Sequence, residues 1–449
     1  MEAAGPVPPK DRPREKALGI LRAVEDGGFT DALLDEARTA FDSRDSAFIL
    51  ELVNGVLRNR TRLDRTIDQF SSHPIAKTDA WTRNILRLAA YQMLFLDRVP
   101  VSAAVNTAAD LAKIHGKKHG YVNGLLRNLD RKRGEIKPPA AADPVERLSN
   151  LYSHPAWLVK RWLAHFGAEA TEALLASNNR PAPFVVRTNT LRTTREGLRT
   201  SLESEGAKAD TLAYSPAGLV VLSSPGLRQL TAFQQGWFTV QDEAAQLVGL
   251  MLAPRPGEAV LDACAAPGGK ATHLAELMQN EGTVTALDPD SRRLERVIEN
   301  TKRLGASIVR PVKGDAAIWQ EGTYDKVLID APCSGLGVLR RHPDGRWTKN
   351  EKDIRSRRQL QDRILANCAS LLRPGGAMVY ATCTTEPEEN EDAVNAFLAG
   401  PGSGFRIDDP RPYLPEPARV LVDAEGFFRT YPRALDMDGF IGVRMVREG

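Results

Sequence analysis

The chain has few of the residues that cross-link a protein or hold a structural metal. Its 449 residues include only 4 cysteines, and no two of them have the spacing of a Cys-x-x-Cys pair. Structural zinc sites and disulfide frameworks need more, or closer, cysteines. Residues 5–10 are polar and rich in proline, unlike the apolar core of a signal peptide. We therefore expect no disulfide and no metal, and thiols that either pack in the core or act in catalysis.

The sequence also lacks long apolar runs and a strong net charge. No apolar run approaches the roughly 18 residues needed to span a bilayer, so we expect a cytoplasmic protein without a membrane partner. Lysine and arginine number 60 against 57 aspartates and glutamates. A surface for nucleic acid would therefore depend on local clusters of basic residues. The length allows about three domains, and 42% hydrophobic residues suffice for their cores.

The first 140 residues are predicted to form an all-α bundle, because apolar residues recur with helical spacing and strand signals are nearly absent. Two such stripes are Ala17, Leu18, Ile20, Leu21 and Val24, and Phe48, Ile49, Leu52, Val53, Val56 and Leu57. Basic residues gather in two segments of this region: Arg58, Arg60, Arg62 and Arg65, and Lys113, Lys117, Lys118, Arg127, Arg131, Lys132 and Arg133. These clusters suit phosphate contact, although a solvated helix face gives the same pattern.

Two segments of this region, residues 51–58 and 121–128, resemble the NusB antitermination-factor family. The resemblance implies a helical RNA-binding domain over residues 1–140. Residues 134–144 have the proline-rich composition of a linker. Residues 146–236 then predict a small α+β domain, with strands at 184–189 and 219–222 and a helix at 191–205. We interpret this domain as an RNA-guiding module; a spacer that packs on the next domain is the alternative.

From residue 237 to 449, strands alternate with helices. The expected strands are residues 259–262, 283–287, 308–312, 326–329, 377–380 and 440–446. This alternation predicts a Rossmann-like α/β domain with a mostly parallel sheet and helices on both faces. Ligands of such sheets bind beyond the carboxyl ends of the strands. The acids and thiols of interest lie at those ends: Asp262, Asp288, Asp315, Asp330, Cys333 and Cys383.

Residues 260–274 indicate a loop that holds a nucleotide-like cofactor. A buried strand ends at Asp262, Pro267 and two glycines break it, and a helix follows. Without Cβ atoms the glycines allow close approach of a ligand. The G-x-G-x-x-G pattern for pyrophosphate is missing, which favours a nucleoside without phosphates such as S-adenosylmethionine. Asp288 suits its ribose hydroxyls; an ordinary α/β turn with an incidental acid is the alternative.

Cys333 and Cys383 each follow a strand of the same sheet, so we expect the two thiols to meet over one pocket. A thiolate that adds to C6 of cytosine makes C5 nucleophilic enough to take a methyl group. Asp330 ends a buried strand, where desolvation would raise its pKa, and is the candidate acid for N3 of the base. Either thiol alone would fit a buried structural role. A pair at strand ends argues against that, whereas Cys368 lies in an apolar helix and is expected to be structural.

The residues around the two thiols suggest further roles. Thr385 and Glu388 have the spacing of a capping box, which predicts a helix whose first amides face the Cys383 sulfur. The segment after Cys333 carries basic and aromatic side chains that would contact RNA phosphates and stack on a base: Arg340, Arg341, His342, Arg346 and Trp347. A surface loop is the alternative for this segment.

Three motifs in residues 150–449 resemble those of the RNA cytosine-C5 methyltransferase family. They are residues 262–270 (Asp-Ala-Cys-Ala-Ala-Pro-Gly-Gly-Lys), 330–335 (Asp-Ala-Pro-Cys-Ser-Gly) and 381–383 (Ala-Thr-Cys). With the NusB-like region in front and residues 340–344 and 437–440, the whole chain resembles the B group of bacterial 16S rRNA cytosine-C5 methyltransferases. This resemblance implies a class I methyltransferase fold, S-adenosyl-L-methionine as cofactor and 16S ribosomal RNA as partner.

The resemblance also implies residue roles. It makes Cys383 the nucleophile and Cys333 the thiol that assists release of the methylated RNA. The residues alone leave the two unranked, because DNA cytosine-C5 methyltransferases use a Pro-Cys thiol. Lys270 would hold Asp330 and the base in register, unless it is simply a lysine at a helix start. Cofactor contacts are implied for Cys264, Ala265, Ala266, Pro267, Gly268, Gly269, Lys270, Asp288, Asp315 and Asp330.

We therefore expect a monomeric cytoplasmic enzyme that methylates C5 of a cytosine in 16S ribosomal RNA through a covalent bond to Cys383. Transfer RNA is an alternative substrate for the same chemistry. A protein of another class, a non-catalytic RNA-binding or antitermination factor with a vestigial methyltransferase domain, is the other alternative. The intact cysteine pair argues against it.

Overall fold

The structure is a computed structural model that describes residues 11–115, 118–137, 142–432 and 435–449. It divides into two compact units: residues 1–180 with 339–348, and residues 181–338 with 349–449. Residues 5–10, Lys117 and positions 138–141 of the expected linker lie outside the described residues. The division into three domains stays a prediction.

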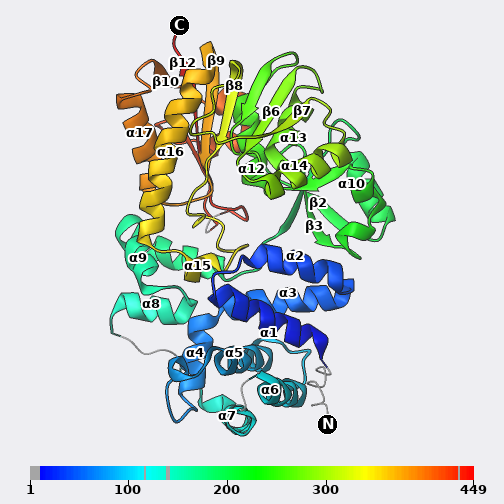
Figure 1. Cartoon of the computed structure of the whole chain (residues 1–449), viewed down its shortest axis with the longest axis vertical. Coiled ribbons are helices and arrows are strands. Elements are labelled where there is room, and N and C mark those ends of the chain that lie inside the picture. Colours follow the sequence, from blue (N-terminus) through cyan, green and yellow to red (C-terminus); the bar gives the residue numbers. More distant parts are fainter. Residues whose placement is uncertain (1–10, 116–117, 138–141, 433–434) are drawn as a thin grey trace, which may run out of the picture. The chain divides into compact units, whose positions relative to one another are not determined.

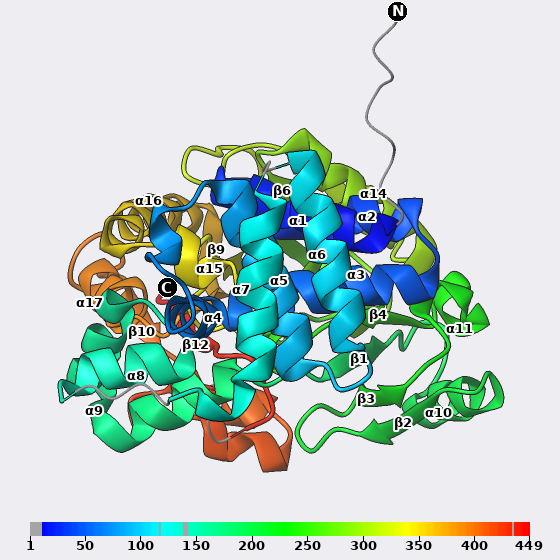
Figure 2. The ribbon, with the colours of Figure 1, turned by 90° about the horizontal axis from the view of Figure 1, so that it is seen from below.

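In the described residues, unit 1 is built from helices. They are α1 (Arg12–Glu25), α2 (Thr30–Ala40), α3 (Ser43–Arg58), α4 (Arg60–Asp68), α5 (Ala80–Phe95), α6 (Val101–His115), α7 (His119–Arg131), α8 (Pro144–Tyr152), α9 (Ala156–Asn178) and α15 (Gly345–Thr348), with short 3-10 turns at Ile75–Lys77 and Arg133–Glu135. Helix α5 packs against α1, α3, α4, α6 and α7, and is buried around most of its circumference (Figure 2). Both predicted apolar stripes are confirmed on α1 and α3, except that Phe48 is only partly buried.

Residues 339–348 belong to unit 1, although their neighbours in sequence belong to unit 2. Arg346 is fully buried and donates to the backbone oxygens of Arg58, Ser153 and Asn178 and to the side chain of Asn179. The indole N–H of Trp347 donates to the backbone oxygen of Leu57 over 2.8 Å. The expectation that Arg346 contacts RNA phosphate was therefore wrong. Its guanidinium has a structural role instead, because its buried N–H groups donate to oxygens of the protein itself.

Unit 2 begins with a four-stranded antiparallel sheet in the order β2-β3-β1-β4 (Figure 2). Its elements are β1 (Phe184–Thr188), α10 (Arg195–Ser204), β2 (Lys208–Thr211), β3 (Gly218–Ser223), a 3-10 turn (Leu227–Gln229), α11 (Thr231–Gln234) and β4 (Phe238–Val240). The two predicted strands are present. The helix starts later than predicted because the Thr194 side chain caps it, accepting from the Gly197 amide at 3.1 Å. Strands β2 and β4 were missed because one is polar and exposed and the other has three residues.

The second sheet of unit 2 has the order β10-β12-β9-β8-β5-β6-β7, with β11 paired to β12. Its strands are β5 (Ala259–Asp262), β6 (Thr283–Asp288), β7 (Val309–Lys313), β8 (Tyr324–Asp330), β9 (Leu372–Thr382), β10 (Phe405–Ile407), β11 (Phe427–Arg429) and β12 (Ile441–Arg447). Strands β5 to β9 are parallel, and β12 is antiparallel to β9. This is the predicted Rossmann-like sheet. Its parallel strands bring the ends of β5, β6, β8 and β9 to one edge.

Helices cover both faces of this sheet, because successive side chains of its strands point to opposite sides. Val260 and Leu328 lie in a buried cluster with α12 (Glu243–Leu252), α13 (Gly269–Leu277) and α14 (Ser291–Leu304). Leu261 and Ile329, one residue further along the same strands, lie in a second cluster with α16 (Glu351–Leu371) and α17 (Glu391–Ala399). Figure 1 shows α16 lying along β9 and β8.

Among the described residues no helix is long and apolar enough to cross a membrane.

Candidate active site

The turn after β5 has the tight geometry predicted for a cofactor loop. Gly268 has φ +98°, a conformation that favours glycine, and a Cβ there would lie 3.2 Å from the Val297 backbone. Helix α13 starts at the next residue. The Asp288 carboxylate at the end of β6 accepts from the Ala266 amide at 3.3 Å. Asp288 therefore lies against the loop, at the edge where the predicted cofactor would bind.

The side chain of Asp262, at the end of β5, is buried without a normal partner. It is 0% exposed, and neither carboxylate oxygen has a hydrogen-bond partner among the described residues. Burial, aided by the charges of Asp330 and Asp288, raises the pKa of Asp262 to about 7, although the Lys270 charge and the Cys264 backbone amide act in the opposite direction. A buried carboxylate without well-placed hydrogen-bond donors is costly. It therefore suits a cationic ligand, and S-adenosylmethionine carries a sulfonium and an ammonium. Sequence reasoning placed Asp262 at this edge but did not include it among the cofactor contacts.

Lys270 and Asp330 are joined by an ion pair of 2.6 Å. The two residues come from the start of α13 and the end of β8, 60 positions apart. Burial alone would lower the pKa of Lys270, but the charge of Asp330 and the hydrogen bond to it outweigh burial and raise the pKa. The ring of Phe440 lies 5.2 Å from the ammonium. Lys270 is thus a fixed positive charge beside the candidate acid.

The thiols of Cys333 and Cys383 lie together, with 3.3 Å between the sulfur atoms. This distance is too long for a disulfide and suits a hydrogen bond between thiols. Both side chains are partly exposed. The hydrogen bond with Cys383 and burial raise the pKa of Cys333 well above its ordinary value. Cys333 is therefore a protonated thiol at neutral pH.

Hydrogen bonds join the two cysteine motifs to residues 437–440. The Gly337 amide donates to the Cys383 carbonyl at 3.0 Å, and the Gly439 amide donates to the Gly337 carbonyl at 2.9 Å. A Cβ at Gly337 would clash with the Gly439 carbonyl. Glycine at 337 is therefore required by the close approach of three backbone segments, which fixes the loop that carries Cys333.

The predicted capping box after Cys383 was wrong. Residues Pro387–Glu389 form a 3-10 turn, and α17 starts only at Glu391. The Thr385 hydroxyl donates to the neighbouring Glu386 carboxylate instead of capping a helix. The spacing matched the motif, but buried partners of Glu389 and Asn390 hold this stretch in a different conformation. The helix that was expected to direct its first amides at the Cys383 sulfur therefore does not begin there.

Glu389 is a site residue that sequence reasoning missed. Its buried carboxylate accepts from the Ser334 amide at 2.8 Å and from the Gln361 side chain at 3.0 Å. Its backbone oxygen accepts from the Tyr380 hydroxyl at 2.7 Å. Ser334 follows Cys333, so Glu389 fixes the loop that carries one thiol to the segment after the other. The sequence shows this residue only as part of an acidic run.

Arg187 on β1 holds the cofactor loop from the side of the antiparallel sheet. It is fully buried and donates to Glu276 over 2.6 Å and to the Gly269 carbonyl over 2.7 Å. It also donates to Thr272 on α13 over 3.2 Å and to Gln241. Burial raises the pKa of Glu276, and Arg187 opposes that rise. The small sheet is thus tied to the start of α13.

We expect Arg187→Met to destabilise the protein by roughly 3–5 kcal/mol, because it leaves the Glu276 carboxylate buried without a counter-ion. Since the pKa of Glu276 then rises further, the loss should be smallest near about pH 4 and should grow as the pH rises toward about 8. Urea unfolding across this pH range measures it. Arg199→Met removes a partly exposed arginine, 3.9 Å from Glu203, and should change stability by less than about 0.5 kcal/mol. An equal effect of both changes would contradict this role for Arg187.

The remaining predicted residues occupy less central positions. Cys264 lies inside the loop, where burial raises its pKa well above the ordinary value. Asp315, after β7, is exposed and accepts from the Ala317 amide at 2.9 Å. Cys368 is fully buried in α16, as expected for a structural thiol. Within the described ranges no three His, Cys, Asp or Glu side chains form a metal-site cluster. The expectation of a metal-independent enzyme stays a prediction.

Comparison with protein families gives three matches along the chain. A family model described as 16S rRNA methyltransferase RsmB/F matches residues 249–445. The NusB family model matches residues 11–131. A model described as an RsmF/B-like ferredoxin-like domain matches residues 154–226.

Curated proteins and solved structures are similar over most of the chain. The probable ribosomal RNA small subunit methyltransferase B of Bacillus subtilis is 35% identical, covering 97% of this chain and 99% of its own. That of Synechocystis sp. is 38% identical over 86% of this chain and 88% of its own. The crystal structure of PH0851 matches with TM-score 0.80 and 30% identity, covering 99% of each chain. NSun6 from Pyrococcus horikoshii, solved with SFG, shares the fold, with TM-score 0.60, 24% identity and coverage of 67% of this chain and all of its own.

Proposed function

The chain belongs to the 16S rRNA methyltransferase RsmB/F family, and from that premise we propose that Cys383 forms a covalent bond to the cytosine that is methylated at C5. The observation that carries the proposal is the pair of sulfur atoms 3.3 Å apart. Asp330, which pairs with Lys270, lies opposite Ala381 of β9, two residues before Cys383, and its strand β8 also pairs with β5. A nucleophile, a proton donor and a cofactor loop are thus present at one edge of the sheet.

S-adenosylmethionine, when bound, supplies a methyl group that is electrophilic because it is carried on a sulfonium. The residues that would hold it fit its chemistry. The Asp262 carboxylate would face a cationic group, and Asp288 would accept from the ribose hydroxyls. The backbone of residues 264–270 would line the nucleoside, and Asp315 and Asp330 would border it.

The protein groups act on the base as follows. The Cys383 thiolate adds to C6 of cytosine, and the electron pair of the C5–C6 double bond becomes available at C5. Asp330, the candidate acid, gives its proton to N3 as negative charge develops there, and Lys270 keeps the carboxyl and the base in register. Once C5 carries the methyl group, a solvent base takes its remaining proton, and the electron pair of that C–H bond re-forms the C5–C6 double bond. The electron pair of the sulfur–C6 bond then leaves with Cys383, and N3 returns its proton to Asp330. Cys333, a protonated thiol beside Cys383, assists release of the methylated RNA.

Transfer of a labelled methyl group tests the proposed function. The purified chain is incubated with tritiated S-adenosylmethionine and with 16S rRNA or transfer RNA, and 5-methylcytosine is mapped in each. We expect label at C5 of a cytosine in 16S rRNA and none in transfer RNA. Label in transfer RNA alone would show that transfer RNA is the substrate. No label in either RNA would indicate an RNA-binding protein without this activity.

Asp330→Asn should lower kcat by roughly 10² to 10³, because an amide cannot pass a proton to N3. The KM for RNA should change little, since the contact matters most as negative charge develops on the base. Asp325, at the opposite end of β8, accepts from the Ala259 amide at 2.8 Å and pairs with Arg373. Asp325→Asn is therefore a matched control, and its kcat should equal that of the parent. Equal loss in the two variants would contradict the role of Asp330.

We also propose that the enzyme works as a cytoplasmic monomer, with residues 1–140 and 146–236 guiding RNA to a catalytic domain of residues 237–449. The NusB match in the first region and the ferredoxin-like match in the second support this division. Light scattering with and without RNA measures the mass of the particle. A dimer in both samples would overturn the monomer.

A further inference from the structure

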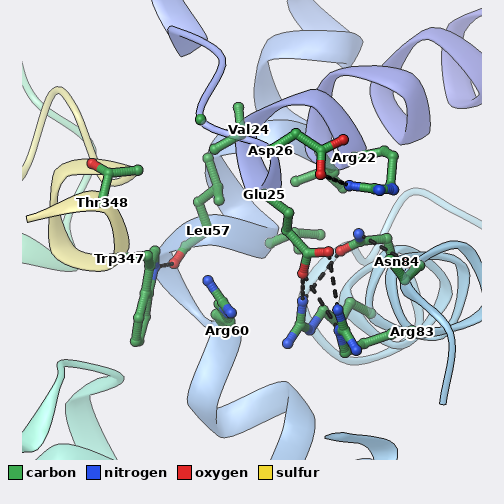
Figure 3. A pocket seen from close by; sticks show the side chains of 15 residues that line it. Arg22, Val24, Glu25, Asp26, Leu57, Arg60, Arg83, Asn84, Trp347 and Thr348 are labelled. Atoms are coloured by element: carbon green, nitrogen blue, oxygen red, sulfur yellow. Dashed lines mark hydrogen bonds and ion pairs between the residues drawn. The ribbon is translucent and has the colours of Figure 1, made fainter. Parts of the chain in front are cut away.

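A cavity of about 540 Å³ lies within unit 1. Figure 3 shows that its side chains come from α1, from the junction of α3 and α4, from α5 and from α15. One side is apolar, formed by Leu21, Val24, Val56 and Leu57. The charged side chains that line it are Arg22, Glu25, Asp26, Arg60, Arg83 and Arg87. Its volume is in the range of small-ligand pockets, roughly 300–1,000 Å³.

Most of these charges compensate one another. Glu25 pairs with Arg83 at 3.2 Å and with Arg87 at 2.7 Å (Figure 3). Arg87 also pairs with Asp64 at 2.6 Å. Arg22 pairs with Asp26 on the same helix. Three of the four arginines therefore have carboxylate partners within unit 1.

Among the described arginines that line the cavity, Arg60 is the one without a carboxylate partner. It makes no hydrogen bond and no ion pair there, and its guanidinium lies 5.1 Å from the ring centroid of Trp347. Burial and the nearby charge of Arg87 lower the pKa of Arg60, and the charges of Asp64 and Glu25 offset this only in part. A half-buried guanidinium without a hydrogen-bonded anion is costly and keeps its planar set of N–H donors unused. The arrangement suits an anion that the chain itself does not supply.

We propose that this cavity binds one phosphate group of the substrate RNA, with Arg60 as its main ligand. This rests on the proposed function, because RNA is the polyanion that the enzyme must hold. A single phosphodiester carries one negative charge, which matches one unpaired guanidinium. The carboxylates of Glu25 and Asp26 line the same cavity and would repel a di- or triphosphate.

The proposed role of Arg60 can be tested because the loss of one phosphate contact changes the salt dependence of RNA affinity by a known amount. The logarithm of RNA affinity falls linearly with the logarithm of salt concentration, and each phosphate contact to single-stranded RNA contributes a slope of roughly −0.7. We expect Arg60→Gln in the full chain to weaken 16S rRNA binding about tenfold at low salt and to make the slope shallower by about that amount. Arg60→Lys keeps the charge and should keep most of the slope. Filter binding over about 50–200 mM salt measures both.

Arg38→Gln is the matched control. Arg38 lies in the same unit on α2, is exposed, pairs with Asp35 at 2.7 Å and belongs to neither basic cluster. This variant should change RNA affinity less than threefold. Melting temperatures of all variants are compared, and Arg60→Gln should melt close to the parent because Arg60 makes no ion pair. If Arg60→Gln fails to fold, Arg60→Lys and Arg60→Met take its place in the binding series.

Each outcome decides the proposal. RNA affinity and salt slope that are the same in the parent and in Arg60→Gln would overturn it. If millimolar inorganic phosphate raises the melting temperature of the parent but not of Arg60→Gln, while RNA binding is unaffected, the cavity is a small-anion site and the RNA proposal fails. An inactive parent whose RNA binding still depends on Arg60 would refute the proposed function alone.

Discussion

Cys383→Ala should abolish methyl transfer to RNA while leaving the fold and RNA binding intact. Removing a catalytic nucleophile costs as much as roughly 10⁶-fold in rate. Without the sulfur there is no addition to C6, and C5 of cytosine is too weakly nucleophilic to react. Initial rates of tritium transfer from labelled S-adenosylmethionine, measured beside filter binding of RNA, test the prediction. More than about a hundredth of the parent rate would show that Cys383 is not the nucleophile.

Cys368→Ala is the control for this variant. Cys368 is a fully buried thiol in α16, and its sulfur lies 3.9 Å from the Ala316 carbonyl. Its removal should lower the melting temperature slightly, since a small buried side chain is lost. The kcat should stay at the parent value. The comparison separates loss of the nucleophile from a general effect of deleting a thiol.

The strand ends of the catalytic sheet could be predicted from the sequence because each is a local pattern. Asp262, Asp288 and Asp330 each close a short apolar run, and the structure places all three at the ends of strands β5, β6 and β8. The meeting of Cys333 and Cys383 followed from the same rule, since the carboxyl ends of parallel strands lie at one edge. Strands β10 and β11 were missed because three residues carry too little periodicity to be recognised.

The groups that fix the site could not be predicted because their partners are distant in sequence. Arg187 bonds to Glu276, 89 positions away, and Glu389 bonds to Ser334, 55 positions away. On their own, Arg187 resembles a strand residue and Glu389 a member of an acidic run. The capping box failed for a related reason. Its spacing was correct, but the stretch after Cys383 follows the buried hydrogen bonds of Glu389 and Asn390 rather than its local preference.

Cys333→Ala should slow release of the methylated RNA, so that protein accumulates covalently attached to RNA. The Cys333 thiol lies 3.3 Å from the Cys383 sulfur, and the raised pKa of Cys333 keeps it protonated at neutral pH. A protonated neighbour can donate a hydrogen bond to Cys383 as the bond between sulfur and C6 breaks, which stabilises the leaving thiolate. Without this donor, addition and methyl transfer still occur but release is slow. A denaturing gel should show a shifted protein band that ribonuclease removes.

The double variant Cys333→Ala with Cys383→Ala tests whether Cys383 forms the covalent bond to RNA. If the bond to RNA is made by Cys383, the double variant should form no shifted band, because the attacking sulfur is absent. Adding Cys368→Ala to Cys333→Ala should leave the band unchanged, since Cys368 is buried away from the base. The methyl label should travel with the trapped band, because transfer precedes release. A shifted band from Cys383→Ala alone would reverse the two roles, and the Pro-Cys thiol would then be the nucleophile.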